Sequence, residues 1–494
     1  MILKKRSFTL VISVVMVVLI SSCHNKEVSK TTGWEYNNSK LGGFELPKYR
    51  EQATGPGLVF IEGGTFVMGR NIDHPMQEWD NVERRVTVPS FYMDETEVSN
   101  LDYLEYLYWL DRVYGETNPE VYQRALPDTL VWRSRLAYND PLVETYFRHP
   151  AYMNYPVVGV TWLQANEYCT WRTDRVNEMI LIKHGILEYD PDQTPKDNFN
   201  TEAYLAGQYE GLVNKNLKNL DPKSTGERIV RLEDGILLPR YRLPTEAEWE
   251  FAALGLIGNT KYERIAERNM YPWKGNNLRA ESKKDYGSLM ANFRRGRGDY
   301  MGVAGSLNDG ADIPGDVRSY WPNDYGLYNM AGNVAEWVQD VYRPLTFADM
   351  DDYRPFRGNV FKTRETLDDG QLVEKDSMGR IRYRNITDEE AANRFNYRTA
   401  DNRNYLDGDQ RSLIDRNMNE EAKVENTTGK MYEYGKTSLI SDKSRVYKGG
   451  SWRDPAHYLS PGARRYLDED KSTNYIGFRC AMTRTGSTTA ARKR

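Results

Sequence analysis

Cysteine and histidine are scarce in this sequence. The 494 residues include three cysteines and five histidines, and the histidines stand at positions 24, 74, 149, 184 and 457. Histidine ligands of a metal usually occur at short, repeated spacings, and none of these five shows such a spacing. The sequence therefore gives no support for a histidine-bound metal centre.

An apolar run long enough to span a membrane is missing near the N-terminus. Lys4, Lys5 and Arg6 precede a run of thirteen residues, 8–20, which ends at Ser21, Ser22 and Cys23. This run is too short to cross a bilayer comfortably, and small residues before a cysteine resemble the lipobox of bacterial lipoproteins. We therefore predict a signal peptide over 1–22 and a lipid on Cys23, which would anchor the chain without a membrane-spanning helix. The alternative is an ordinary signal peptide with an incidental cysteine.

An excess of positive charge is also missing. Lysine and arginine number 67 against 71 acidic residues, a net charge of -4, and no basic tract follows the signal peptide. Proteins that bind nucleic acid usually carry a basic patch or stripe, so we predict no nucleic-acid partner. The length allows two or three domains or one elaborated domain.

The segment Asn323–Trp337 (NDYGLYNMAGNVAEW) is rich in turn formers and aromatic residues and fits neither a regular helix nor a regular strand. Asn329, Asn333 and Glu336 place several side-chain oxygens close together in it. Amide, carboxylate and backbone carbonyl oxygens are the ligands that calcium prefers. The segment is thus either a calcium loop or a polar turn capped by its own side chains.

The same segment closely resembles the signature of the formylglycine-generating enzyme, or sulfatase-modifying factor, superfamily. Three further regions agree: Gly57–Gly69 with the opening strand pair, Tyr241–Ala253 (YRLPTEAEWEFAA) with the central helix motif, and the segments KGGSW at 448–452 and GFRCA at 477–481 with the closing strands. The likeness covers about half of the chain. It implies an α+β fold of the formylglycine-generating-enzyme, C-type-lectin-like kind, with little regular secondary structure, over residues 57–485.

The resemblance divides the rest of the chain into added segments. Residues 23–56 form a predicted tether, which lies either across the domain or against a partner, and 486–494 form a polar tail. Three insertions interrupt the domain, at about 111–155, 173–238 and 341–443. The last is charged and poor in aliphatic residues, which favours either solvated loops or a lobe that binds a partner.

Two helix starts can be read directly. In DETEVSNLDYLEYLYWL, Ser99 or Asn100 can cap a helix that we expect to bury one side formed by Leu101, Leu104, Leu107 and Tyr108.

In RLPTEAEWEF, Thr245 can cap a helix and Glu248 completes a capping box. We interpret Glu246, Glu248 and Glu250 as structural, because their helix positions are expected to face apart and because the helix dipole favours acids there.

The resemblance also implies two structural calcium sites. It places Asn292 and Asp309 as side-chain ligands and Phe293 and Ala311 as carbonyl ligands of one ion. It places Asn329 and Glu336 as side-chain ligands and Gly332 and Val334 as carbonyl ligands of the other. Both sets keep oxygen-bearing residue types, as a hard cation requires.

The catalytic positions of the superfamily are altered. A formylglycine-generating enzyme uses two cysteines that bind copper through their thiolates, and this sequence has Asp454 and Leu459 at those places. Neither residue can form a thiolate, so we predict no copper and no formylglycine chemistry. His457, the nearest histidine, is expected to be a surface or packing residue.

Cys169 and Cys480 remain after lipidation of Cys23. The resemblance places both at positions bridged in the formylglycine-generating enzyme, and secretion to an oxidising compartment favours a disulfide. The alternative is a pair of buried free thiols.

The lipobox together with GPGLVFIEGGTFVMG, FYMDETEV, LPDTLVWR, YPVVGV and TDRVNEMI resembles one branch, the gliding-motility lipoprotein J family of Bacteroidota. That resemblance implies a non-enzymatic, periplasm-facing outer-membrane lipoprotein that serves gliding motility and type IX protein secretion with lipoprotein K and other envelope proteins. The alternatives are a glycan-binding lipoprotein and an enzyme of altered chemistry that uses Asp454, Arg464 and Arg465 in the former active-site groove.

Overall fold

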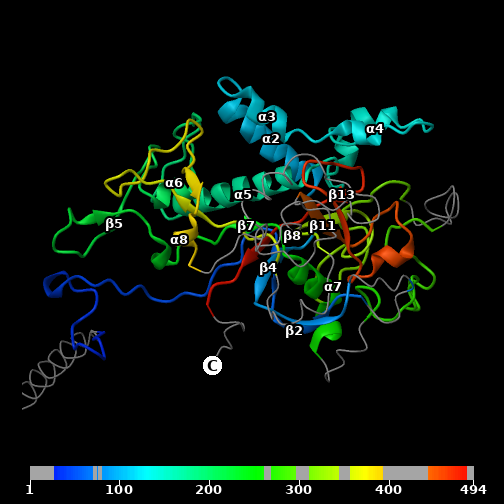
Figure 1. Cartoon of the computed structure of the whole chain (residues 1–494), viewed down its shortest axis with the longest axis horizontal. Coiled ribbons are helices and arrows are strands. Elements are labelled where there is room, and N and C mark those ends of the chain that lie inside the picture. The colour runs from blue at the N-terminus through cyan, green and yellow to red at the C-terminus, as the bar shows by residue number, and fades with distance from the viewer. Residues whose placement is uncertain are drawn as a thin grey trace, which may run out of the picture.

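A computed structural model describes residues 27–70, 75, 81–260, 269–295, 311–343, 356–392 and 443–486. Figure 1 shows a core around β8, β11 and α7, and a second lobe around α6, β5 and α8 that α5 joins to the core. The helices are α2 (Asn100–Tyr114), α3 (Pro119–Ala125), α4 (Asp140–Thr145), α5 (Trp162–Lys183), α6 (Thr201–Leu205), α7 (Glu246–Thr260) and α8 (Asp388–Ala391). Short 3-10 helices are η1 (Ser39–Leu41), η2 (Thr129–Trp132), η3 (Pro150–Tyr152), η4 (Leu232–Asp234) and η7 (Ala456–Leu459).

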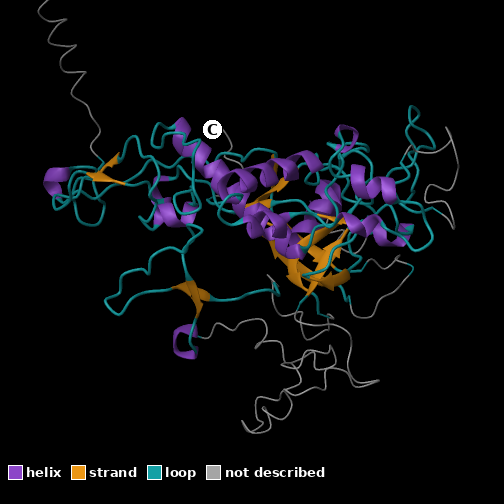
Figure 2. Ribbon diagram, turned by 90° about the horizontal axis from the view of Figure 1, so that it is seen from above, coloured by secondary structure: helices purple, strands orange, loops and turns teal. Residues whose placement is uncertain are grey.

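Two four-stranded sheets form the core. The first has the order β1 (Leu58–Ile61), β4 (Phe91–Asp94), β14 (Ala481–Thr483), β7 (Tyr241–Arg242). The second has the order β12 (Arg465–Asp468), β11 (Ser444–Lys448), β8 (Ala335–Val341), β13 (Ile476–Gly477). The first sheet joins the start of the domain to its end. Figure 2 shows helices and irregular loops around these strands, which confirms the expected α+β class with little regular structure.

The opening strands do not pair with each other. β1 pairs with β4, whereas β2 (Gly64–Met68) pairs with β3 (Arg84–Val88), so the expected opening strand pair is wrong in its pairing. Gly63 lies between β1 and β2, and a Cβ there would stand 2.3 Å from the carbonyl oxygen of Val88. The turn therefore needs glycine because the returning backbone passes too close for a side chain.

Helix α2 begins as expected but buries a different side. Ser99 is its N-cap and forms a capping box with Asp102. Leu107 is buried, but Leu101 is 53% exposed and Tyr108 is 68% exposed. The buried side consists of Asn100, Tyr103, Tyr106, Leu107, Leu110, Val113 and Tyr114. The predicted side was right for Leu107 and, in part, for Leu104, which packs partly buried against the core, but it was wrong for Leu101 and Tyr108, because tyrosines fill much of the contact with α5 and the sheet.

The insertion at 173–238, the first long insertion, begins inside a helix. Helix α5 continues through residue 173 to Lys183, and it carries the chain out of the core into the second lobe (Figure 1). That lobe has a small apolar cluster of its own, formed by Leu181, Ile186, Leu187, Phe199, Tyr204, Val230 and Leu237. The lobe also contains the short hairpin β5 (Leu217–Lys218) with β6 (Glu227–Arg228). The insertion is therefore a packed extension rather than only a set of loops.

The described part of the predicted tether, the segment before β1, lies across the domain. Glu45 forms an ion pair with Arg228 of the insertion and accepts a hydrogen bond from the backbone of Leu220 (3.0 Å). Farther along, Gln52 accepts a hydrogen bond from the backbone of Thr485 (2.7 Å). The arm 43–53 thus joins the second lobe to the end of the last strand.

The second long insertion leaves the core after β8. That strand ends at Val341, and Arg343 is fully buried, so the first residues of the predicted 341–443 segment belong to the core. Its described part carries the hairpin β9 (Lys362–Arg364) with β10 (Tyr383–Asn385). Among the residues described, no helix is long and apolar enough to cross a membrane.

Candidate functional site

Asp454, which the resemblance places at a catalytic cysteine position, belongs to an ion pair. Both oxygens of Asp454 accept hydrogen bonds from Arg465, from Nη1 to Oδ1 and from Nη2 to Oδ2, each at 2.6 Å. The hydroxyl of Ser451 also donates to Oδ2 at 2.5 Å. The carboxylate is therefore a partner for a guanidinium, in a geometry that is strong because two parallel bonds form.

A shallow pocket of about 490 Å³ surrounds this pair. Arg294, Arg453 and His457 line it together with the ion pair, and Tyr458 and Tyr475 form its aromatic walls. Arg465 stacks on Tyr458 at 4.3 Å from the ring centre, while Arg453 hydrogen-bonds to Asn474 (2.8 Å). The pocket is thus basic and aromatic, and none of the described residues that line it carries a thiol.

The other two residues considered for this groove lie elsewhere. Leu459 is fully buried in an apolar cluster with Tyr271, Leu289 and Phe293. Arg464 is also buried, and its guanidinium donates to Glu246 from Nε to Oε1 at 2.6 Å. Of the three residues proposed for an altered chemistry, only Asp454 and Arg465 share the pocket.

Glu336, a predicted calcium ligand, belongs to a buried ion pair. Its Oε1 accepts from Arg479 Nη2 (2.6 Å), and its Oε2 accepts from Arg479 Nε (2.6 Å) and from the indole nitrogen of Trp249 (2.7 Å). Glu336 and Arg479 are both fully buried. Any calcium ion at this carboxylate would have to compete with the guanidinium.

Glu97 lies beside this pair and was not identified from the sequence. Its two oxygens accept from the amides of Asn329 (2.9 Å) and Asn333 (3.0 Å), which both have positive φ angles. Burial raises the pKa of Glu97 to about 8, although nearby Arg479 opposes this shift. A single acid before a helix cap gives no sequence signal, so only the fold could bring Glu97 to this loop.

The two predicted calcium loops are packed against each other. The backbone of Asn333 donates to the carbonyl of Asn292 (2.9 Å), and a Cβ on Gly332 would stand 2.3 Å from that oxygen. The amide oxygens of Asn292 and Asn329 are buried without a hydrogen-bond partner among the described residues, which fits a ligand at this place. Of the expected carbonyl donors, Phe293 and Val334 lie in buried positions and Ala311 in a half-buried one.

These loops fit a hard cation only in part. The asparagine oxygens suit calcium, whereas Glu336 already has a cationic partner, and no group of three His, Cys, Asp or Glu side chains among the residues described could hold an ion. Asp309, the other carboxylate assigned to these sites, and the lipidation residue Cys23 lie outside the described residues. Calcium therefore stays a prediction.

The glutamates of α7 have structural roles. Glu248 forms the expected capping box with Thr245 and pairs with Arg242. The expectation that the three acids face apart is wrong for the other two, because Glu246 and Glu250 both contact Lys448, at 3.3 and 3.0 Å. Residues four apart share one helix face, and here that face meets a buried lysine.

The predicted cysteine pair is brought together by the fold. The sulfurs of Cys169 on α5 and Cys480 before β14 lie 3.4 Å apart, and both are buried free thiols in the structure. Burial raises the pKa of Cys480 well above its ordinary value. Proximity fits the expected disulfide, whose formation stays a prediction.

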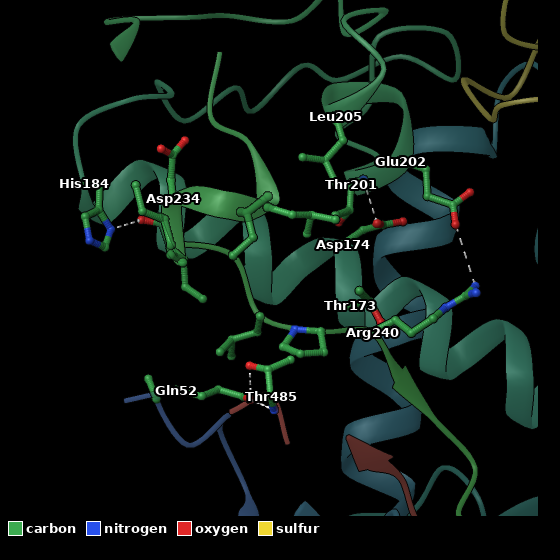
Figure 3. Close-up of a pocket in the computed structure, with 18 of the residues that line it drawn as sticks. Gln52, Thr173, Asp174, His184, Thr201, Glu202, Leu205, Asp234, Arg240 and Thr485 are labelled. Carbon is green, nitrogen blue, oxygen red and sulfur yellow. Dashed lines mark hydrogen bonds and ion pairs between the residues drawn. The ribbon is translucent and has the colours of Figure 1, made fainter. Parts of the chain in front are cut away.

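Another cavity in the described part of the chain is built by residues other than those around position 454. Its volume is about 1230 Å³, and it opens between the arm, α5, the first insertion and the described part of the second (Figure 3). Gln52 and Thr485 lie on one side of it, across from Thr201 and Leu205. Sequence reasoning missed this cavity because its walls come from four separate segments.

This fold and this altered groove define a class of protein. A family model for the sulfatase-modifying factor enzyme 1-like domain matches residues 43–484, and the chain therefore belongs to this family. The fold is the formylglycine-generating-enzyme fold, as expected.

Several individual proteins are similar to this chain. The chain is 26% identical to the formylglycine-generating enzyme of Mus musculus over 59% of its own length and 63% of that protein's length. It is 23% identical to inactive C-alpha-formylglycine-generating enzyme 2 of the same species, over 59% of its own length and 71% of that protein's. Among solved structures, PvdO from Pseudomonas aeruginosa matches with a TM-score of 0.41 and 15% identity, over 87% of this chain and 99% of that one. The chain thus spans less than two thirds of the first of these relatives.

Proposed function

We propose that this chain is a non-enzymatic member of the sulfatase-modifying factor family, of the gliding-motility lipoprotein J branch. It is anchored through Cys23 to the outer membrane, faces the periplasm, and acts as a structural component of the gliding and type IX secretion machinery. The observation that supports a non-enzymatic role is the closed ion pair of Asp454 with Arg465 at a place where the enzyme needs a thiolate.

The position of Leu459 supports the same proposal. Its side chain is fully buried in an apolar cluster, where it contributes to packing. An altered enzyme in this groove gains little support, because Arg464 is turned to Glu246 and the remaining acid is already paired.

The added segments support a structural role. The arm, the first insertion and the hairpin β9–β10 are held to one another by specific contacts: Glu45 with Arg228, and Tyr383 with Glu202 (2.9 Å). A chain without the catalytic thiols, but with added segments that pack in a defined arrangement, suits binding better than catalysis.

Activity is tested with the purified protein, copper and a cysteine-containing sulfatase peptide, read by mass spectrometry. We expect no formylglycine product. A formyl product that disappears in Asp454→Asn would contradict the proposal and establish an enzyme of altered chemistry.

The structural role is tested by crosslinking in envelopes of the native host, followed by affinity purification of the intact chain and of Cys23→Ser. We expect lipoprotein K and other type IX components with the intact chain, and their loss, together with release from the membrane fraction, in Cys23→Ser. Recovery of no envelope protein with the intact chain would overturn the scaffold proposal.

A further inference from the structure

The walls of the cavity between the arm, α5 and the first long insertion are rich in aliphatic side chains. Ile180, Leu205, Leu217, Ile236 and Leu237 line it, and its volume of about 1230 Å³ exceeds that of a typical small-molecule site. An apolar concavity of this size, which no described residue fills, marks a place where another apolar group binds.

The acids of the walls are already satisfied. The Oδ1 atom of Asp174 accepts from the backbone of Thr201 (2.8 Å), and Oδ2 accepts from the side chain of Asn200 (3.2 Å), as Figure 3 shows for the first of these. Asp234 pairs with Arg228 at 2.7 Å. The cavity therefore does not require a cationic ligand in its interior.

The rim of the cavity carries solvent-exposed apolar and cationic side chains. Leu232 lines the cavity and is 66% exposed. Lys48 and Arg50 of the arm also line it, are exposed, and make no ion pair with another described residue. Two lining acids have cationic partners: Glu51 of the arm pairs with Arg484, and Asp234 pairs with Arg228. The charge that the arm leaves at this rim is therefore the positive charge of Lys48 and Arg50.

The arm also offers backbone groups. The residues described make no backbone hydrogen bond to Lys48, Tyr49 or Arg50, and no described strand pairs with this part of the chain. A peptide could satisfy such groups through its own main chain, which an acyl chain cannot do.

We propose that this cavity is a docking site for an extended segment of a partner protein, with aliphatic side chains that enter the cavity and acidic residues that meet Lys48 and Arg50. The inference rests on the proposed structural role, since it names the surface through which the scaffold holds a partner. The cavity is formed largely by segments added to the family core, and the basic pocket at Asp454 takes no part in it.

The first test places the photocrosslinker benzoylphenylalanine at Leu232 in the full-length protein in its host. The control position is Leu136, which is 96% exposed and does not line the cavity. We expect adducts from position 232 to map to one partner segment that combines aliphatic and acidic residues. We expect no adduct with that segment from position 136. Adducts with lipid alone, or the same proteins from both positions, would overturn the inference.

The second test uses a synthetic peptide of the mapped segment and the purified protein, with binding followed by fluorescence polarisation. We expect Lys48→Glu with Arg50→Glu to weaken binding about tenfold, more at low salt than at high salt. The matched control Lys215→Glu, an exposed lysine of the first insertion outside the cavity, should bind as the parent does. Equal binding by all three proteins would refute the charge complementarity.

A third variant tests the apolar part. Leu232→Asp should lower the affinity about tenfold, whereas Leu136→Asp should leave it unchanged; both leucines are exposed, so neither change disturbs the core. If these tests fail while type IX components are still recovered with the intact chain, the docking site is refuted and the proposed structural role is not. A mapped segment from a protein outside that machinery would keep the docking site and sink the proposed function.

Discussion

The buried pair of Glu336 and Arg479 allows a sharp prediction about stability. The guanidinium donates to both carboxylate oxygens at 2.6 Å and also reaches the backbone carbonyls of Asp94 (3.1 Å) and Tyr328 (2.8 Å). It therefore connects β4, the loop before β8 and β8 itself. Arginine keeps its charge in a protein, so it cannot escape by losing a proton.

Glu336→Gln removes the negative charge and leaves the guanidinium buried. Breaking one side of a buried ion pair costs about 3–5 kcal/mol, because the remaining charge stays desolvated without compensation. For a cooperative unit as large as this domain, that loss lowers the melting temperature by roughly 3–8 °C. Glu336→Leu with Arg479→Met should recover much of the loss, since no charge remains buried.

The chain provides a matched control on its surface. Glu390 and Arg384 form a bidentate pair with distances of 2.6 and 2.7 Å, and their side chains are 40% and 39% exposed. Exposed pairs contribute little to stability because solvent screens them, so Glu390→Gln should change the melting temperature little. The Glu336–Arg479 and Glu390–Arg384 pairs have similar geometry but different burial, so comparing them isolates the effect of burial on stability.

Calorimetry of the parent, Glu336→Gln and Glu390→Gln, with EDTA and with added calcium, checks this reasoning. We expect the loss in Glu336→Gln to be the same in both conditions, because the partner of Glu336 is Arg479. If calcium stabilised the parent but not Glu336→Gln, and EDTA removed the difference between them, Glu336 would be a calcium ligand and the ion-pair reasoning would be refuted.

Three further predictions follow from other buried groups. The pKa of Glu97 is raised from 4.5 to about 8, so the stability that its protonation contributes is complete below pH 4.5 and is lost as pH rises toward 8. This loss amounts to roughly 1.4 kcal/mol for each pH unit within that window. Unfolding measured against pH should show no such loss for Glu97→Gln, whereas the exposed control Glu120→Gln should keep it. Lys448→Met should lower the unfolding free energy by about 3–5 kcal/mol in chemical denaturation, because Glu250 stays buried without this cation; a loss below about 1 kcal/mol would contradict this, since only exposed pairs contribute so little. If Cys169 and Cys480 form a disulfide, protein exported to the periplasm and denatured without reductant should expose neither thiol to iodoacetamide. Replacing both cysteines by alanine should then lower the unfolding free energy by about 2–4 kcal/mol. Full labelling with iodoacetamide would show that the thiols are free.

Local sequence rules predicted the parts of the fold that depend on neighbouring residues. The N-cap at Ser99 and the capping box of Thr245 with Glu248 depend on residues at most three positions away, so the sequence alone indicated them. The buried side of α2 was predicted only in part: Leu107 is buried as expected, whereas Tyr108 was placed on that side and is exposed, because an amphipathic tyrosine packs equally well at a buried or an open position.

Long-range electrostatics could not be predicted from the sequence. Glu336 was predicted to bind calcium because its loop is rich in oxygen donors, yet its partner Arg479 lies 143 residues away. Glu97 meets Asn329 across 232 residues. Such pairs form only after β4, β8 and β14 have assembled, so no local pattern records them.

Asp454 and Leu459, which the resemblance places at the two catalytic cysteine positions of the enzyme, differ in kind. Asp454 lies at the pocket and places a charge, which Arg465 neutralises with two hydrogen bonds, where the enzyme has a thiol. Leu459 has instead joined the apolar packing around Phe293, next to Asn292 in the chain. A cysteine placed at position 454 would leave Arg465 without its partner, and one placed at position 459 would leave a cavity in a close-packed cluster. Two thiols alone would therefore not rebuild a copper site, because the groove has acquired packing and charge that hold a different surface in place.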